Sequence, residues 1–250
     1  MNLSAVGRLV GWVLVAIGLV MLGCAGVARV LGDPVSAVFA LAAAGAVSLA
    51  VGTALGAGCR WKGELTRREG FATVVAGWGV ASVAGAVPFR LSGVIPDWTA
   101  AMFETMSGLT TTGASVIAHP DTLPRGLLLW RAITHFFGGM GVLLLFVAVL
   151  PLVGTGGMQL FRAEMPGPTK DRLTPRIAGT AKRLWAVYLV LNAAEILALR
   201  LAGMGWFDAV CHSFATIATG GFSTRTESLG AFTSPAIHWI VIVFMALSGI

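Results

Sequence analysis

Long apolar stretches alternate with shorter polar segments along the whole chain. They span residues 9–31, 35–58, 70–90, 126–150, 184–203 and 235–250. Each is close to the roughly 20 residues that an α-helix needs to cross the hydrocarbon core of a bilayer. The pattern predicts an all-α, polytopic membrane protein. Because the last stretch reaches Ile250 with no polar residues after it, we expect the chain to be truncated within its final structural unit.

Two of the intervening segments, residues 91–125 and 204–234, have a different pattern. Each holds a short, moderately apolar piece followed by a run of Thr, Ser and Gly. Neither piece is long enough to cross a bilayer as a helix. We expect both segments to be re-entrant loops, which enter the membrane and return on the same side.

These two segments are copies of one unit. Residues 98–116, WTAAMFETMSGLTTTGASV, align with residues 206–224, WFDAVCHSFATIATGGFST, at a constant offset of 108. Identical residues are paired at Trp98/Trp206, Ala101/Ala209, Thr111/Thr219, Gly113/Gly221 and Ser115/Ser223. Each copy follows one spanning stretch and precedes another. The predicted unit is therefore helix, short pore helix with a Thr/Gly segment, helix.

The Thr/Gly segments suggest a cation pathway. An extended run such as Thr110–Gly113 would direct successive carbonyls toward one line, and glycine allows the positive φ that other residues resist. Rings of such carbonyls replace the hydration shell of K⁺ in potassium channels. A pore helix that starts at the outer surface directs its partly negative C-terminal end toward the membrane centre, which favours a cation there.

Composition excludes several other functions. Hydrophobic residues make up 56% of the chain and charged residues 11%, with a mean hydropathy of +0.85, whereas soluble proteins average about 25% charged residues. A cytosolic enzyme, a secreted disulfide scaffold and a disordered regulator are excluded. The HExxH, GxSxG and GxxxxGK motifs are absent, so we predict no enzymatic activity. The three scattered cysteines favour neither disulfides nor structural zinc.

The basic residues predict the orientation in the membrane. Of 17 Lys and Arg, 11 lie on one predicted face, at Arg8, within residues 59–69 and within residues 158–183. The positive-inside rule makes this face cytoplasmic, so the net charge of +6 reflects topology and we expect no nucleic-acid partner. The N-terminus is then cytoplasmic and both pore loops open outward. The acidic residues on the predicted outer side are Asp33, Asp97, Glu104, Asp121, Asp208 and Glu227. Together they would raise the local concentration of cations; the alternative is that they are ordinary solvated loop charges.

Five sequence blocks resemble the TrkH family, the membrane subunits of bacterial Trk potassium uptake systems, which belong with KtrB and HKT proteins to a superfamily of K⁺ transporters. The blocks are KGELTRREGF (62–71), FETMSGLTTTGAS (103–115), FFGGMG (136–141), GGMQLFRAEMPGP (156–168) and HSFATIATGGFST (212–224).

The resemblance implies a division of the chain into units. Two N-terminal helices form a hairpin over residues 1–61, and the first helix–pore–helix repeat covers residues 62–157. A cytoplasmic linker over residues 158–183 joins it to an incomplete second repeat over residues 184–250. The family pattern has four such repeats, arranged like the subunits of a K⁺ channel. It also implies a homodimer in the bacterial inner membrane and a cytosolic nucleotide-binding regulator of the RCK type.

The resemblance also assigns two filter segments. The first filter segment is Thr110, Thr111, Thr112 and Gly113, and the second filter segment is Ala218, Thr219, Gly220 and Gly221. Only Gly113 and Gly221 keep the glycine of a T-x-G pattern, and no Tyr-Gly follows. We therefore expect looser K⁺ selectivity than in a channel, with Rb⁺ accepted and no organic cofactor. Supporting roles are assigned to Glu104 and His212, at matched positions of the two pore helices, and to Ser115 and Ser223.

The sequence leaves the mode of transport open. Channel-like K⁺ flux competes with an alkali-cation symporter coupled to H⁺ or Na⁺, and a non-conducting membrane scaffold is the alternative from a different class. Two repeats supply two of four filter strands, so residues 1–250 alone are expected not to conduct K⁺. Prolines in the linker predict a shaped loop there rather than a helix, with Lys170 and Arg172 available to dock the regulator.

Overall fold

The regular structure described for this chain is helical. The computed structural model describes residues 2–59, 67–153 and 173–249. The long helices are α1 (Leu3–Val30), α2 (Val35–Gly58), α3 (Arg67–Leu91), α5 (Arg125–Val153) and α7 (Leu173–Leu201), followed by α9 (Pro235–Ser248). The short helices are the two pore helices, α4 (Trp98–Leu109) and α8 (Trp206–Ile217), and the 3₁₀ turns η1 (Pro120–Thr122) and η3 (Ser228–Ala231).

Helix lengths and surface composition confirm the predicted fold class. Among the described residues, four helices are long and apolar enough to cross a membrane: Leu3–Val30, Val35–Gly58, Arg68–Leu91 and Ala181–Leu201. Large apolar side chains lie exposed along these helices, such as Phe39 at 66% and Val75 at 73%. Water would penalise such a surface, whereas lipid does not. By contrast, α4 and α8 have 12 residues each, about 18 Å at 1.5 Å per residue, and reach only part of the way across.

The N-terminal hairpin is held together by facing glycines. A Cβ built on Gly18 of α1 would stand 2.7 Å from the carbonyl oxygen of Gly45 on α2. A Cβ on Gly11 would stand 2.8 Å from the carbonyl oxygen of Gly52. The two backbones approach so closely that no other residue fits without separating them. Small residues at such crossings gain van der Waals contact where lipid removes the hydrophobic driving force.

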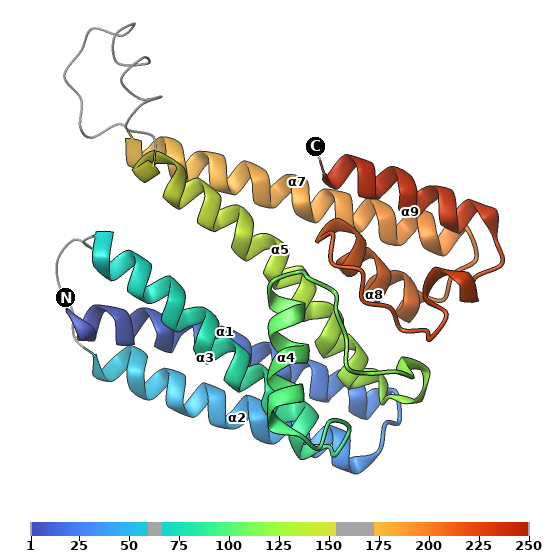
Figure 1. Cartoon of the computed structure of the whole chain (residues 1–250), viewed down its shortest axis with the longest axis horizontal. Coiled ribbons are helices and arrows are strands. Elements are labelled where there is room, and N and C mark those ends of the chain that lie inside the picture. The colour runs from blue at the N-terminus through green and yellow to red at the C-terminus, as the bar shows by residue number, and fades with distance from the viewer. Residues whose placement is uncertain (1, 60–66, 154–172, 250) are drawn as a thin grey trace, which may run out of the picture.

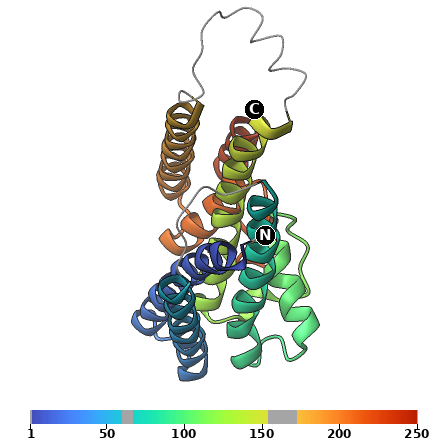
Figure 2. The ribbon, with the colours of Figure 1, turned by 90° about the vertical axis from the view of Figure 1, so that its left-hand side faces the viewer.

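Helix α5 is the central element of the fold (Figures 1 and 2). It contacts α1 and α2 of the hairpin, the pore helix α4 of the first repeat, and both α7 and α8 of the second repeat. The loop residue Asp33, between α1 and α2, caps its N-terminus by accepting the backbone N–H groups of Arg125 at 3.1 Å and Gly126 at 2.6 Å. The cap fixes the first repeat against the hairpin and satisfies N–H groups that a helix start leaves free.

Helix α7 begins before the apolar stretch that the sequence predicts as its span. The predicted linker, residues 158–183, lies partly outside the described residues, but from Leu173 onward it belongs to α7. The prediction that prolines interrupt helix is wrong for Pro175, which lies in the first turn of α7. There the backbone N–H groups have no partner within the helix, so a proline costs little. Lys170 and Arg172 lie outside the described residues.

The glycine contact predicts a position-specific loss of stability. Replacing Gly18 by Val should place two methyl groups against the backbone of Gly45 and destabilise the hairpin by about 1–3 kcal/mol. The same replacement at Gly26, whose Cβ would meet nothing within 4 Å, should change stability little. Thermal unfolding of both variants in detergent is the measurement. Equal melting temperatures would contradict the close packing at Gly18.

Candidate ion-binding site

The first pore helix ends in a turn that satisfies two of its last carbonyls. The N–H of Thr111 donates to the carbonyl of Gly108 at 3.1 Å, and the N–H of Thr112 donates to the carbonyl of Ser107 at 2.9 Å. This pair of bonds is a Schellman motif, the usual device for closing a helix with a left-handed residue. It satisfies carbonyls that water cannot reach inside a membrane.

The second pore helix ends in the same turn, 108 residues later. The N–H of Thr219 donates to the carbonyl of Thr216 at 2.9 Å, and the N–H of Gly220 donates to the carbonyl of Ala215 at 2.8 Å. Each donor and acceptor matches its counterpart in the first repeat. The sequence repeat is therefore also a repeat of backbone geometry.

A threonine occupies the left-handed position of both turns. Thr111 and Thr219 each have φ of +54°, a conformation that glycine adopts freely and β-branched residues avoid. Such a conformation costs on the order of 1–3 kcal/mol and persists only where the surroundings enforce it. Sequence reasoning places both threonines in the filter segments but misses their strain. The available signal is the matched Thr at the position where a helix of this kind usually ends in Gly.

The filter segments are shorter in their extended part than expected. Thr110, at φ −85° and ψ 4°, and Ala218, at φ −75° and ψ −4°, are the C-caps of the pore helices, so neither is extended. The left-handed Thr111 and Thr219 follow these two C-caps directly. The expectation of a continuous extended run from Thr110 is thus wrong, because closing the helix requires the turn first.

Two matched glycines also have positive φ. Gly113 has φ of +73° and Gly221 has φ of +89°, as the shared glycines of the repeat predict. A Cβ on Gly113 would lie 1.8 Å from the carbonyl oxygen of Gly220, whereas a Cβ on Gly221 would meet nothing within 4 Å. The first and second filter segments therefore meet at Gly113, and glycine is required there for space as well as conformation.

Glu104 of α4 organises the first filter segment. Its carboxylate accepts hydrogen bonds from the Ser115 hydroxyl at 3.0 Å and from the N–H of Val116 at 2.9 Å. It also accepts a hydrogen bond from Nε of Arg131 on α5 at 2.6 Å. The side chains of this ion pair are 0% and 5% exposed. The carboxylate thus joins the pore helix, the backbone beyond the filter segment and α5.

Arg131 extends this network to the second repeat. Its Nη1 donates to the carbonyl of Ser223 at 2.8 Å, and its guanidinium lies 3.7 Å from the centroid of the Phe222 ring. One buried cation therefore contacts both filter regions. Sequence reasoning missed Arg131. The signal that could have found it is an ionisable side chain inside a predicted spanning stretch, which is a functional candidate by default.

His212 occupies the position in α8 that Glu104 occupies in α4. Its Nδ1 lies 2.8 Å from the carbonyl of Asp208, and its Nε2 lies 3.0 Å from the Ser223 hydroxyl. Because a carbonyl only accepts, Nδ1 carries a proton and Nε2 accepts from Ser223 in the neutral tautomer. The Ser223 hydroxyl in turn accepts the N–H of Arg225 at 3.0 Å.

The support by serine is also repeated. In the first repeat the Ser115 hydroxyl accepts the N–H of Ile117 at 3.0 Å, the match of the Ser223 contact in the second. The structure brings Glu104 together with Ser115, and His212 together with Ser223. Of the four residues predicted to support the filter, Glu104, Ser115 and Ser223 accept backbone N–H groups that follow the filter segments. The fourth, His212, contacts the Ser223 hydroxyl.

Helix α5 presses directly on the second filter segment. The ring of His135, which is 0% exposed, stacks on Phe222 with ring centroids 4.0 Å apart. A Cβ on Gly220 would stand 2.6 Å from this ring. Neither ring nitrogen of His135 has a hydrogen-bond partner among the residues whose side chains the structure describes. The contact is therefore one of packing.

Two glycines of the FFGGMG block bring α5 against the ends of both pore helices. A Cβ on Gly138 would stand 2.2 Å from the carbonyl oxygen of Leu109, the last residue of α4. A Cβ on Gly139 would stand 3.1 Å from Cα of Ala218, the C-cap of α8. Helix α5 therefore packs directly against the C-terminal ends of both pore helices.

The acidic residues that the sequence predicts on the outer side mostly have structural partners. Asp121 accepts the hydroxyl and the backbone N–H of Thr226, and these hydrogen bonds hold the pKa of its carboxyl below the usual range. Asp208 pairs with Arg225 at 2.7 Å and accepts the Thr224 hydroxyl at 2.6 Å. The Asp97 side chain caps α4 by accepting the N–H of Ala100 at 2.7 Å. Asp33 bonds to the N-terminus of α5, and Glu104 bonds to Arg131. These carboxylates therefore join helices and loops of the protein to one another.

The arrangement offers backbone oxygens to a cation. No group of three or more His, Cys, Asp or Glu side chains in the described part of the chain could hold a metal ion. The candidate ligands are instead carbonyl and hydroxyl oxygens of the filter segments, ligands that suit an alkali cation. A hairpin followed by helix–pore–helix units, each pore helix closing in a strained turn, is the architecture of a polytopic membrane protein with channel-like repeats.

Comparisons with known proteins identify the family. Residues 37–250 match the TrkH family, described as cation transport proteins. The chain is 51% identical over 212 residues to the Trk system potassium uptake protein TrkH of Escherichia coli K12, which covers 81% of this chain and 43% of that protein. It is 46% identical over 187 residues to TrkG of the same strain, which covers 74% of this chain and 39% of that protein.

A solved structure agrees with the fold. The crystal structure of the potassium transporter TrkH from Vibrio parahaemolyticus superimposes with a TM-score of 0.86 at 42% identity, over 100% of this chain and 50% of that one. The chain belongs to the TrkH family, which confirms the resemblance seen in the sequence. The family is one of transport proteins and not of enzymes. The chain spans about half the length of the relatives that it matches.

The buried ion pair predicts an unequal response to loss of the two arginines. Arg131→Gln should destabilise the protein by about 3–5 kcal/mol, because it leaves the Glu104 carboxylate without its counter-ion in an enclosed place. Arg225→Gln removes a cation that is 44% exposed and should cost at most about 1 kcal/mol. Thermal unfolding in detergent compares the two. A smaller loss for Arg131→Gln than for Arg225→Gln would refute the organising role of the buried pair.

Proposed function

We propose that the chain forms part of a K⁺ uptake pathway across the bacterial inner membrane, as the transmembrane subunit of a Trk-type system. K⁺ is the transported ion and Rb⁺ is accepted in its place. The observation that carries the proposal is the repeated filter turn: two pore helices end in the same strained backbone geometry, 108 residues apart. A non-conducting membrane scaffold would not require this repeated turn.

The electrostatics of the turn favour a cation beyond it. The carbonyls of Ser107 and Gly108 are occupied by the Schellman bonds, so neither is available to an ion. The partly negative C-terminal ends of α4 and α8 add to the attraction. Glu104 and Arg131 neutralise each other, so neither repels or traps the ion as a free charge would.

The orientation and the assembly form part of the proposal. With Arg8 on the cytoplasmic side, both pore loops face outward and the filter segments are entered from outside. We propose a homodimer and a cytosolic nucleotide-binding regulator of the RCK type as partners, in line with the family resemblance. The linker within residues 158–183 is the proposed contact for the regulator.

The glycines of the filter segments provide the test. Gly113→Ser and Gly221→Ser should each lower K⁺ uptake or its discrimination against Na⁺, because both positions need positive φ. Gly113→Ser should have the larger effect, since it also collides with the Gly220 carbonyl. Growth on low K⁺ of a bacterium without its own K⁺ uptake, carrying the complete gene that encodes this chain, is the measurement.

Gly26→Ser is the matched control. Gly26 lies in α1 with no atom within 4 Å of a built Cβ, so growth should equal that of the parent. Unchanged growth and unchanged Na⁺ discrimination in both filter variants, with the proteins present in the membrane, would rule out the proposed pathway.

A further inference from the structure

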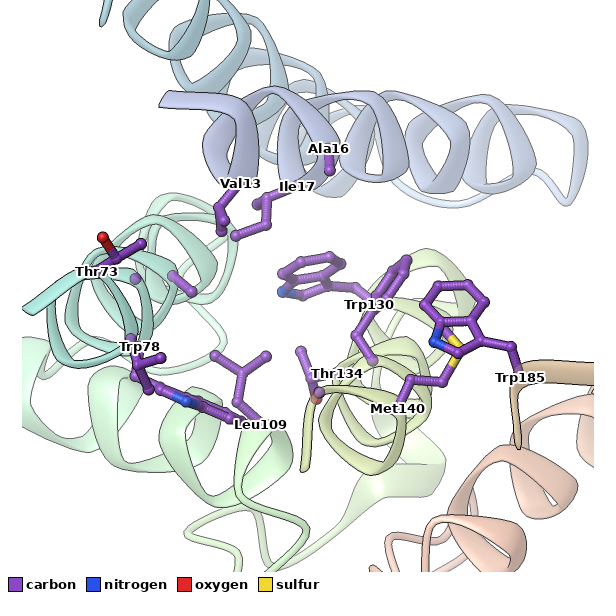
Figure 3. Close-up of a pocket in the computed structure, with 15 residues that line it drawn as sticks. Val13, Ala16, Ile17, Thr73, Trp78, Leu109, Trp130, Thr134, Met140 and Trp185 are labelled. Atoms are coloured by element: carbon purple, nitrogen blue, oxygen red, sulfur yellow. The ribbon is translucent and has the colours of Figure 1, made fainter. Parts of the chain in front are cut away.

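A cavity lies behind the first filter segment and has no part in the proposed ion pathway. It measures about 580 Å³ and lies between α1, α3, α5 and α7. Figure 3 shows Val13 and Ile17 on one side, Thr73 and Trp78 on another, and Trp130 and Trp185 facing the space from α5 and α7. The volume is within the range of about 300–1,000 Å³ that small-molecule sites occupy.

Three polar side chains of the wall have hydrogen-bond partners within the protein. The Thr73 hydroxyl donates to the carbonyl of Glu69 at 2.8 Å, and the Thr134 hydroxyl donates to the carbonyl of Arg131 at 2.6 Å. The indole Nε1 of Trp130 donates to the carbonyl of Gly85 at 3.0 Å. Since these donors are satisfied within the protein, the cavity favours an apolar occupant. At membrane depth the available apolar molecule is a lipid acyl chain.

Basic residues precede the cavity on three of its helices. α1, α3 and α7 begin on the same side of the molecule (Figure 1). Arg8 precedes the lining residue Val13 by five positions, and Arg68 precedes Thr73 by five, about 8 Å along a helix. Lys182 and Arg183 likewise stand just before Trp185 on α7, and both are exposed.

We propose that this cavity holds one acyl chain of an anionic phospholipid of the cytoplasmic leaflet, whose phosphate lies among Arg68, Lys182 and Arg183. Basic pockets between helices on the cytoplasmic side are a recurrent way to bind anionic headgroups. The proposal rests on the orientation proposed above. The acyl chain would contact Leu109, the last residue of α4, and Thr134 of α5. Thr134 itself packs against α4 at Gly108, where a built Cβ would stand 2.1 Å from its hydroxyl oxygen. The lipid would therefore pack behind the first filter turn.

The cavity itself is tested by a matched pair of variants on α3. Gly77 lines the cavity, whereas Gly79 does not, and a Cβ at either position meets nothing within 4 Å. Gly77→Phe should expel the acyl chain and Gly79→Phe should not. Native mass spectrometry of the purified protein with phosphatidylglycerol, and with phosphatidylcholine of identical acyl chains, counts the retained lipid. The parent and Gly79→Phe should retain phosphatidylglycerol preferentially, and Gly77→Phe should lose it.

The headgroup contact is tested by charge. Neutralising Arg68, Lys182 and Arg183 to Gln should weaken phosphatidylglycerol retention at least about fivefold, since each basic residue near anionic lipid contributes a comparable factor. Neutralising Arg29 and Arg90, in the last turns of α1 and α3, is the control and should leave retention unchanged. Equal retention of the two lipids by the parent, or equal losses in both charge variants, would overturn the proposal. Because lipid retention is measured without ion flux, its failure leaves the K⁺ pathway intact.

Discussion

A helix that ends inside a membrane must dispose of its last carbonyls without water, and this constraint shapes the structure around both pore helices. The Schellman turn at the end of α4 and α8 consumes the carbonyls of Ser107, Gly108, Ala215 and Thr216. Only the carbonyls that follow are left for an ion. The cost is a threonine in a left-handed conformation in each turn, which the surroundings must enforce.

Helix α5 supplies that enforcement for both repeats. Its glycines allow backbone contact with the two helix ends, and Arg131 joins the Glu104 carboxylate to the carbonyl of Ser223. The matched position in the second repeat holds His212 rather than a second carboxylate. The buried Arg131 guanidinium is therefore balanced by the Glu104 carboxylate alone, and this pairing leaves neither charge uncompensated in an apolar setting. The two repeats share the same backbone turn, but only the first has a carboxylate at the matched position of its pore helix.

The sequence predicted the spanning stretches and the repeat because both depend on local composition and periodicity. It did not predict where Pro175 lies relative to α7, since a proline in the first turn and a proline in a loop look alike without the helix start. Nor did it predict that Asp33 caps α5 or that Arg131 pairs with Glu104. Those contacts join residues distant in sequence, and only packing brings them together. Thr111 was misjudged because residue preference alone argues against a left-handed threonine.

The most direct test of the account is the position of the ion itself. Crystals of the protein in Rb⁺, examined by anomalous scattering, should show a peak beside the backbone oxygens that follow the two turns, at Thr111 to Gly113 and Thr219 to Gly221. The oxygens of Glu104 should remain bonded to Arg131, Ser115 and Val116 and should not coordinate the ion. A Rb⁺ peak on the acidic side chains, with none along the filter segments, would contradict the account.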